Sequence, residues 1–187
     1  MSGVRVVNAA SPARRPDLVI RVATAADAER LHDSLMGIAR TVNGTEKVRC
    51  SVADLLEYGF GPDPHFEALV AEVDGAYAGM CLFFRCFSTW LGRPGVYVQD
   101  LYVDEAFRSL GVGRKLLRRV AAIARDRDGV YMRLSVDIGN VVAQDFYTRL
   151  EILVPDAEQA RAAYGEAFLN LAAADCPPGG TLTRGSA

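Results

Sequence analysis

A glycine-bearing turn at residues 108–113 has the residue types that bind phosphate. It reads Arg-Ser-Leu-Gly-Val-Gly, it follows an apolar stretch at 96–103, and a helical pattern begins at Val112. The first N–H groups of a helix have no partner inside the helix, and the helix dipole is positive at that end. Glycines let the backbone approach an anion closely. The spacing therefore predicts a phosphate site at the start of a helix.

Basic side chains surround this turn. Residues 106–125 contain no acidic residue, although the whole chain has a formal net charge of −2. Five cations lie within twelve positions, namely Arg108, Arg114, Lys115, Arg118 and Arg119. This local positive charge suits a ligand with several phosphates. The alternative is that these side chains form an ordinary solvated face of a helix.

Two common nucleotide-binding motifs do not fit the turn. A P-loop reads GxxxxGK[ST], and the sequence contains no such run. A Rossmann turn reads GxGxxG and follows the first strand of a repeated strand-helix unit. Here the turn follows a central predicted strand, and a predicted antiparallel hairpin comes before it.

Strands and helices are both predicted around the turn. Alternating or β-branched apolar residues predict strands at the following residues: 18–22, 66–73, 76–87, 96–103 and 130–137. Helix-start signals at Thr24/Asp27 and Ser51/Asp54 precede two helices. Two more helices are predicted from 112 to the Asp128-Gly129 pair and at 139–150. Asp74-Gly75 predicts a hairpin turn, and residues 88–95 are expected to form a loop.

The composition favours one globular domain. The 187 residues are 50% hydrophobic and 24% charged, which is typical of a chain with a sizeable core. We expect a flexible extension at 1–17, one domain at 18–175 and a disordered tail at 176–187. Residues 1–16 lack the continuous apolar stretch of a signal peptide, and no apolar run approaches the length of a membrane span.

Cysteine usage and net charge narrow the expected partners. The four cysteines have no CxxC spacing, which argues against a zinc site or a disulfide framework and favours a reducing cytoplasm. The two histidines are separated and do not make a metal site, so no metal is expected. The small net charge gives no sign of a nucleic acid or an anionic membrane as a partner.

Taken together, these motifs resemble those of the GNAT N-acetyltransferase superfamily. The turn at 108–113 is similar to the family's R/Q-x-x-G-x-G/A signature, whose loop binds the pyrophosphate of acetyl-CoA. Asn140 and the Phe146-Tyr147 pair resemble its second motif, an Asn followed seven residues later by a Tyr. The run at 87–103 is similar to the diamine (spermidine/spermine) N-acetyltransferase-like branch.

The resemblance covers about residues 18–150 and implies a fold and a cofactor. The fold class would be α/β (α+β), with the GNAT fold's central mixed, mostly antiparallel sheet flanked by helices. The cofactor would be acetyl-CoA, acting as a co-substrate. Its binding residues would be Leu101, Val103, Arg108, Ser109, Leu110, Gly111, Val112, Gly113, Arg114, Lys115 and Asn140.

The resemblance also implies how these residues bind the cofactor. Backbone groups of Leu101 and Val103 would bind the pantetheine arm, where the central strand splays from its neighbour. Residues 109–114 would cradle the pyrophosphate, with Arg108 opening the loop. Lys115 and nearby arginines would meet the ribose phosphate.

Catalysis would fall to Tyr147 and Asp100. Acetyl transfer needs a neutral amine, a polarised thioester carbonyl and a proton for the leaving sulfur. A thiol has a pKa of about 8.5 and a phenol of about 10, so a positioned Tyr147 can protonate the CoA thiolate. Asp100 would hold a cationic amine or relay its proton, and Asn140 would bind pantetheine or line the acetyl site. The alternatives are a core aromatic at Tyr147 and a strand-end cap or buried salt bridge at Asp100.

The acceptor site is where this chain departs from the branch that it resembles. Gln99 stands where the branch typically has Glu, and Gln cannot act as a base or hold an ammonium by charge. Gln99, Asp100 and Trp90 are the predicted substrate-binding residues. Beyond residue 155 the sequence allows one long helix at 156–174, or a strand at 159–164 followed by a helix at 165–174. The resemblance favours the second arrangement.

We therefore expect a cytoplasmic N-acetyltransferase that transfers acetyl from acetyl-CoA to a primary amine of a small molecule in a ternary complex. Gln99 and the altered C-terminal segment leave a non-catalytic acyl-CoA-binding or sensing module as an alternative. A peptide or protein N-acetyltransferase is a third possibility, and it would need an open groove. Aromatic residues at and near the loop at 88–95 favour a homodimer, namely Phe83, Phe84, Phe87 and Trp90.

Overall fold

The computed structural model describes residues 16–155 and 161–174 of the chain. Contacts divide the chain into two compact units, residues 1–151 and residues 152–187. The first unit contains every described strand and four of the described α-helices. The second unit contains one described α-helix, α5 (Glu166–Ala174). The predicted extension at 1–17, except residues 16 and 17, and the predicted tail at 176–187 lie outside the described residues.

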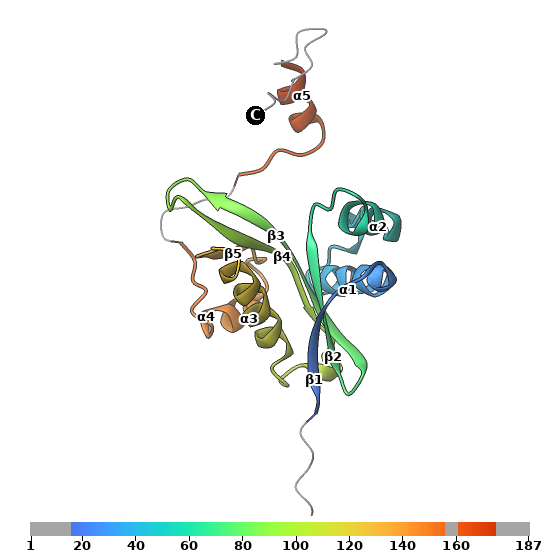
Figure 1. The fold of residues 1–187 in the computed structure, drawn as a ribbon. Coiled ribbons are helices and arrows are strands. Elements are labelled where there is room, and N and C mark those ends of the chain that lie inside the picture. Colours follow the sequence, from blue (N-terminus) through green and yellow to red (C-terminus); the bar gives the residue numbers. More distant parts are fainter. Residues whose placement is uncertain (1–15, 156–160, 175–187) are drawn as a thin grey trace, which may run out of the picture. The chain divides into compact units, whose positions relative to one another are not determined.

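The first unit is built on a five-stranded sheet in the order β1-β2-β3-β4-β5 (Figure 1). The strands are β1 (Leu18–Val22), β2 (Glu67–Val73), β3 (Ala76–Ser88), β4 (Arg93–Val103) and β5 (Met132–Leu134). The first four strands are antiparallel, and β5 alone runs parallel to its neighbour β4. The prediction of a mixed, mostly antiparallel sheet flanked by helices is therefore confirmed.

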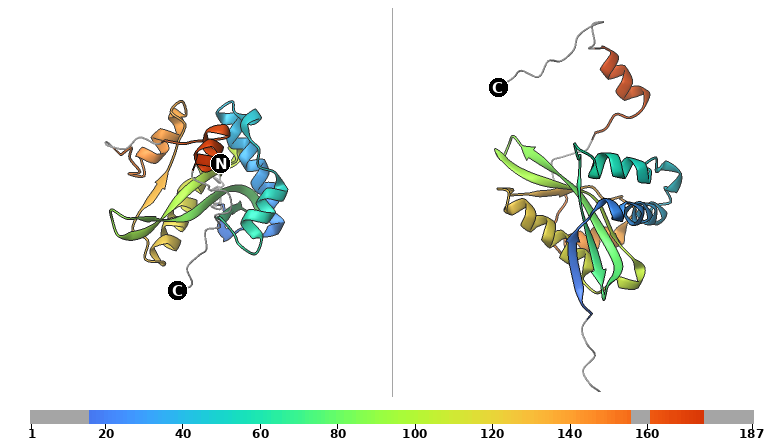
Figure 2. Two further views of the ribbon diagram at one scale, coloured as in Figure 1. Left: turned by 90° about the horizontal axis from the view of Figure 1, so that it is seen from above. Right: turned by 45° about the vertical axis from the view of Figure 1, so that its right-hand side comes forward.

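Helices cover both faces of this sheet (Figures 1 and 2). One face carries α1 (Ala28–Thr41) and α2 (Val52–Phe60), and the other carries α3 (Val112–Arg125) and α4 (Val141–Thr148). Three short 3₁₀ turns connect these elements, η1 (Ala25–Asp27), η2 (Thr45–Lys47) and η3 (Glu105–Phe107). The site therefore lies on a sheet that is packed from both sides.

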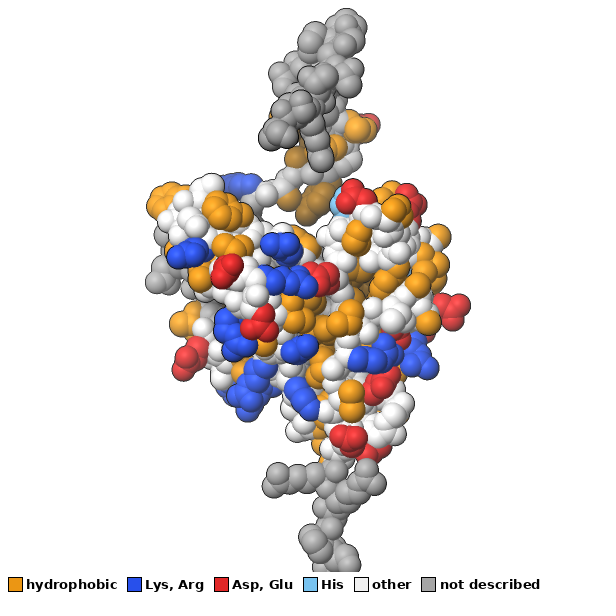
Figure 3. All heavy atoms as spheres, in the orientation of Figure 1, with side chains coloured by type: hydrophobic (Ala, Val, Ile, Leu, Met, Phe, Trp, Pro, Cys, Tyr) orange, Lys and Arg blue, Asp and Glu red, His pale blue; other side chains and the backbone are white. Residues whose placement is uncertain are grey.

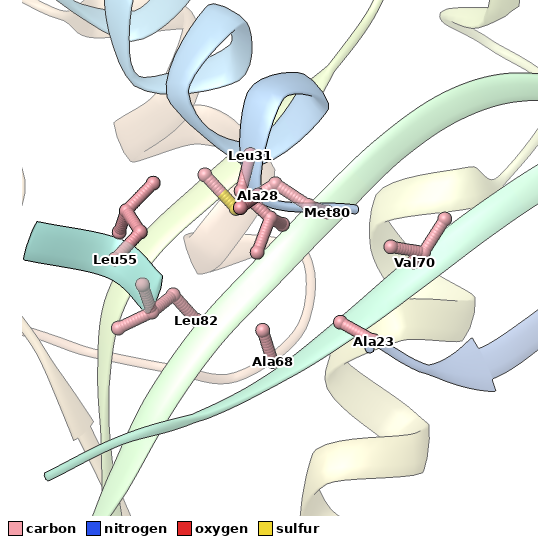
Figure 4. Packing of buried hydrophobic residues seen from close by; sticks show 8 residues of the cluster. All are labelled: Ala23, Ala28, Leu31, Leu55, Ala68, Val70, Met80 and Leu82. Carbon is pink, nitrogen blue, oxygen red and sulfur yellow. The ribbon is translucent and has the colours of Figure 1, made fainter. Parts of the chain in front are cut away.

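Apolar side chains fill the space between the sheet and the helices on each face. Figure 4 shows the cluster beneath α1 and α2, which consists of Ala23, Ala28, Leu31, Leu55, Ala68, Val70, Met80 and Leu82. On the other face, α3 buries Val112, Leu116, Leu117 and Val120. These four positions recur at helical spacing, so one side of α3 is apolar and the opposite side is left for its charged residues.

The helix starts predicted from the sequence are confirmed. Thr24 with Asp27, and Ser51 with Asp54, each form a capping box. Asp27 is also tied to β1, because both of its carboxylate oxygens accept hydrogen bonds from Arg21 at 2.7 Å. Arg21 donates a third hydrogen bond to Glu72 on β2 at 3.0 Å. The start of α1 is thereby fixed to the edge of the sheet.

Three predicted segments differ from the structure. The expected loop at 88–95 is only a four-residue turn, because β4 begins at Arg93 and pairs with Ser88. The strand expected at 130–137 is limited to residues 132–134. A single helix over 156–174 is wrong, since α5 begins at Glu166. The alternative strand is absent over residues 161–164, and its first residues, 159 and 160, lie outside the described part of the chain.

Candidate active site

Two neighbouring strands separate at the centre of the first unit. β4 pairs with β5 only from Val96 to Val98, opposite Met132 to Leu134. Beyond Val98, β4 continues to Val103 while β5 has ended. The edge of β4 over residues 99–103 is therefore left without a neighbouring strand on that side, as the expected splay requires.

A β-bulge at Gln99 decides which backbone groups face this open edge. Asp100 pairs with Leu82 and Val98 pairs with Phe83, so Gln99 is an extra residue in β4. Before the bulge, the Val96 N–H donates to the Tyr131 carbonyl on the β5 side.

After the bulge, the Asp104 N–H donates to the Ala78 carbonyl on the β3 side. Because successive N–H groups along a strand point to alternate edges, the N–H groups of Leu101 and Val103 point away from β3, toward the open edge. These are the two residues predicted to bind the pantetheine arm.

The glycine turn follows the end of β4. Gly111 is the N-cap of α3 with φ of 80°, and Ser109 also has a positive φ of 66°. The Lys115 N–H is bonded to the Gly111 carbonyl at 3.0 Å, so the N–H groups of residues 112–114 precede the first helical hydrogen bond. No acidic residue lies in the first turn of α3. This geometry fits the predicted phosphate site.

Charged side chains hold the turn or extend along α3. Arg108 donates to the Val103 carbonyl at 3.3 Å and pairs with Glu105 at 3.2 Å, so it fastens the turn to the end of β4. The Lys115 ammonium donates to the Leu18 carbonyl on β1. Arg114, like Ser109 and Leu110 in the turn, is exposed. Figure 3 shows Lys and Arg side chains gathered over α3.

Asn140 and Tyr147 lie at the start and near the end of α4. The Asn140 side-chain oxygen accepts the Ala143 N–H at 3.1 Å and caps the helix, which leaves its NH₂ group available as a donor. A Cβ atom at Gly113 would lie 3.2 Å from the ring of Phe146. The absence of a side chain at Gly113 therefore lets α4 pack closely against the start of α3.

The Tyr147 hydroxyl is a protonated donor at neutral pH. Burial, with smaller contributions from Cys81 and Asp100, raises the pKa of Tyr147 to about 12. The Tyr147 ring meets that of Phe146 edge to face, with 5.3 Å between the ring centroids. Tyr147 can therefore pack as a buried aromatic residue and also act as the proton donor.

Asp100 lies in a cleft on the α1 side of the sheet. The cleft has a volume of about 560 Å³, and its walls are formed by residues from α1, from the segment between α1 and α2, and from β3 and β4. Gln99 and Asp100 both line it, because the two residues of such a bulge turn their side chains to the same face. Burial raises the pKa of Asp100 to about 6. No ion pair of Asp100 occurs within residues 16–155 and 161–174, so the salt-bridge alternative has no support there.

The model of the Acetyltransferase (GNAT) family matches residues 29–151. The chain belongs to the GNAT acetyltransferase family. The match begins in α1 and ends after α4, so this GNAT domain includes the splayed strands, the glycine turn and Tyr147.

The relatives agree with this assignment. The chain is 33% identical over 141 residues to thialysine N-epsilon-acetyltransferase of Sus scrofa, covering 71% of this chain and 82% of the relative. It is 30% identical over 136 residues to spermidine/spermine N(1)-acetyltransferase-like protein 1 of Homo sapiens, covering 69% of this chain and 19% of the relative. These relatives match the diamine acetyltransferase-like branch.

Solved structures share the fold of this GNAT domain. An integron cassette protein from V. cholerae aligns with a TM-score of 0.69 and 19% identity, covering 83% of this chain and 97% of the other. Aminoglycoside N-acetyltransferase AAC(6')-Iy, solved in complex with CoA, aligns with a TM-score of 0.62 and 17% identity, covering 83% and 97%.

The structure brings most of the predicted site residues together and leaves one apart. Trp90 is 98% exposed in the turn between β3 and β4, and it is not among the residues that line the cleft. Sequence reasoning missed Asp137, Lys47, Arg49 and Cys50, which do line the cleft. The signal for the last three was present but weak, because a short polar segment between two helices is usually only a connection. No helix among the described residues is long and apolar enough to cross a membrane.

Proposed function

We propose that this protein transfers the acetyl group of acetyl-CoA to the primary amine of a small molecule, by direct attack in a ternary complex. The observation that carries the proposal is the separation of β4 from β5 next to the bulge at Gln99. It leaves the N–H groups of Leu101 and Val103 without a strand partner among the described residues, beside a glycine turn, and Asp100 of the same strand lines a cleft. The relatives, which are named for acetyl transfer to small amines, support the same reaction.

The donor set fits acetyl-CoA. The open-edge N–H groups of Leu101 and Val103 would bind the pantetheine arm, and the free N–H groups at the start of α3 would bind the pyrophosphate. The NH₂ group of Asn140 is a further donor near the start of α4. Acetyl-CoA supplies the activated acetyl group when bound. The backbone N–H groups on β4 are also the donors available to polarise the thioester carbonyl.

Protons must move during the transfer. The new C–N bond forms as the C–S bond breaks. The acceptor ammonium loses one proton before it attacks and a second after the C–N bond has formed, and the sulfur gains one proton. The second amine proton replaces, through water, the one that Tyr147 gives to the sulfur. We assign the first proton to Asp100, directly or through water, because its pKa of about 6 allows it to be ionised at pH 7 and still accept a proton. We assign to the hydroxyl of Tyr147 the proton that the leaving sulfur gains. This scheme uses no metal ion and no covalent enzyme intermediate.

Replacing Tyr147 with Phe tests the assignment of the acid. We expect kcat to fall about a hundredfold with little change in the Kd for acetyl-CoA, because the variant keeps the ring and loses only the proton donor. Release of CoA thiol with a panel of primary amines measures the rate. Tyr58→Phe is the matched control, since Tyr58 is an exposed residue of α2 outside the cleft. Full activity of Tyr147→Phe would remove Tyr147 from the mechanism.

A non-catalytic acyl-CoA-binding module is the second candidate, and Gln99 is the observation that favours it. Neutral Gln99 stands in the bulge at the position where the branch has an acid. Such a module would be stabilised against heat by CoA, yet it would release no thiol with any amine. The thiol-release panel separates the two functions.

The oligomeric state and the compartment are also part of the proposal. We propose a cytoplasmic homodimer that contacts its partner copy through the β3-β4 hairpin, with no nucleic acid or membrane as partner. The support is the exposure of Phe87, Trp90 and Leu91 at the end of this hairpin. In sedimentation experiments we expect the native protein to be a dimer and Trp90→Ser to be a monomer. An unchanged dimer would place the interface elsewhere.

A further inference from the structure

The cleft has charged groups of opposite sign on different walls. Asp100 comes from β4, and Asp137 follows β5. Lys47 and Arg49 come from the segment between α1 and α2, which forms another part of the lining. The lining between them is apolar and includes Leu35, Ile38, Val42, Leu55, Phe66 and Leu82. A ligand that matches this cleft has a cationic group, an aliphatic body and an anionic group.

Lys47 and Arg49 have no acidic partner among residues 16–155 and 161–174. Both are exposed at the cleft, and neither makes a side-chain hydrogen bond or an ion pair with a described residue. Asp54, the acid that follows them at the start of α2, is instead bonded to the Ser51 hydroxyl at 2.6 Å. The two cations are therefore available to an anion inside the cleft.

Cys50 connects the two kinds of charge, because it follows the two cations closely in the chain and lines the same cleft as Asp100. Burial, Asp54 and Asp100 together raise the pKa of the Cys50 thiol, so the Asp100 carboxylate lies near Cys50 in the cleft that both residues line. Lys47 and Arg49 precede Cys50 by three residues and by one. Three residues of extended chain span at most about 11 Å. A short acceptor can therefore meet both ends of the cleft.

We propose that the acceptor is an ω-amino carboxylate, with its amine at Asp100 and its carboxylate at Lys47 and Arg49. This inference rests on the proposed acetyl transfer. A diamine of the same length would bring a second ammonium against two cations, which disfavours it by charge repulsion. Neutral Gln99 fits the same preference, because it adds no negative charge for a second ammonium.

Three acceptors of equal length test this preference. They are 5-aminopentanoate, pentylamine and 1,5-diaminopentane, which carry an anionic, a neutral and a cationic far end on the same reacting amine. We expect kcat/KM to be at least tenfold higher for 5-aminopentanoate than for 1,5-diaminopentane, with pentylamine between them. The difference should lie mainly in KM, and it should shrink as salt screens the charges.

Neutralising the two cations tests their role. In Lys47→Gln/Arg49→Gln, the ratio of kcat/KM for 5-aminopentanoate to that for pentylamine should fall about tenfold. Arg85→Gln is the control, since Arg85 is exposed on β3 and does not line the cleft. Unchanged binding of acetyl-CoA would verify that the double variant is folded.

The outcomes separate this inference from the function on which it rests. Turnover without a preference for the carboxylate, or a preference that survives the double substitution, would overturn the inference alone. Binding of acetyl-CoA without turnover of any of the three amines would overturn the proposed function and the inference with it.

Discussion

At the scale of single residues, burial raises the pKa of both proton-carrying groups, and the ordinary difference between a carboxyl and a phenol keeps them in opposite protonation states. Asp100, with a pKa of about 6, is mostly ionised at pH 7, while Tyr147, with a pKa of about 12, is protonated. A phenol of that pKa is a weaker acid than a thiol by roughly 3–4 units, or about 5 kcal/mol. Part of this difference comes from the charge of Asp100 itself. When Asp100 accepts the proton of the amine, that charge disappears and the pKa of Tyr147 falls by the share that Asp100 contributed, while the larger effect of burial remains.

Asp100→Asn should lower kcat/KM for amines about a hundredfold, because the amide cannot accept the proton. In the native protein, kcat/KM should fall as the pH drops below about 6, where Asp100 becomes neutral. The variant should lack this acid limb, whereas Asp63→Asn, a change in an exposed loop outside the cleft, should keep it. A pH profile of thiol release measures both. If the fall in kcat/KM near pH 6 persists in Asp100→Asn, a group other than Asp100 causes it.

The same substitution should stabilise the fold at neutral pH. The pKa of Asp100 is raised from the usual 3.8 to about 6 in the folded protein, so the fold favours the protonated carboxyl. The stability that Asp100 contributes in this form is complete below pH 3.8 and is lost as the pH rises through about 6. At pH 7 the ionised carboxylate thus lowers the free energy of unfolding by roughly 2–3 kcal/mol, and a neutral Asn side chain does not have this effect. Thermal unfolding should show a higher Tm for Asp100→Asn at pH 7 and little difference at pH 3. A lower Tm at pH 7 would show that Asp100 has a stabilising partner.

At the scale of elements, the bulge in β4 and the contact between α3 and α4 build the site. The bulge shifts the alternation of the strand by one residue, so Leu101 and Val103 present their N–H groups to the gap that opens beyond β5. Gly113 lets the ring of Phe146 approach α3, which places the next residue, Tyr147, relative to the glycine turn. The bulge thus aligns backbone groups, and the contact between the helices aligns the side chain of Tyr147.

Gly113→Ala tests the contact between the helices. The new Cβ would lie 3.2 Å from the Phe146 ring, so α4 must move by a few tenths of an ångström and carry Tyr147 with it. We expect kcat to fall about fivefold from this misalignment. The Tm should not fall much, because Ala favours a helix over Gly by about 1 kcal/mol. Steady-state kinetics and thermal unfolding check the two expectations, and an unchanged kcat would show that the packing does not position Tyr147.

Asp27→Asn tests the anchor at the start of α1. Asp27 is 4% exposed, and its hydrogen bonds from Arg21 lower its pKa to about 2. This depressed pKa contributes stability that is present above the unfolded value of 3.8 and is lost as the pH falls through about 2. The variant should lose about 2 kcal/mol of unfolding free energy at pH 7, measured in urea. Asp33→Asn, an exposed change on α1, should lose almost nothing. Equal stability of the two variants at pH 7 would contradict the role of the pair.

Local signals in the sequence predicted most elements, and tertiary contacts decided the exceptions. The Asp74-Gly75 turn forms as expected, with a positive φ at both residues. Residues 88–95 contain Gly92, Pro94 and Gly95 and therefore resemble a loop. The strand nevertheless begins at Arg93, because Gly95 leaves room for the ring of Tyr131 and Val130 donates to the Pro94 carbonyl. β5 is shorter than its apolar pattern indicates, since β4 bends away from it at the bulge.

At the scale of the whole molecule, the cofactor half of the site was easier to predict than the acceptor half. The glycine turn and the Asn140–Tyr147 spacing are contiguous motifs with a backbone mechanism, so the sequence alone indicates them. The acceptor cleft instead joins residues from separate elements, such as Lys47 and Asp137. No spacing in the sequence connects these two residues. Trp90, which the sequence predicted at the acceptor site, lies outside the cleft of the single chain.

We propose that the gap between β4 and β5 serves acetyl transfer to an amine, and the formation of the acetylated product decides this. Incubation with acetyl-CoA labelled in its acetyl group and with 5-aminopentanoate, pentylamine and 1,5-diaminopentane, followed by mass spectrometry, tests it most directly. We expect a labelled N-acetyl amide of at least one amine, formed in equal amount to the CoA released. Acetyl-CoA that binds and remains intact with all three amines would contradict it.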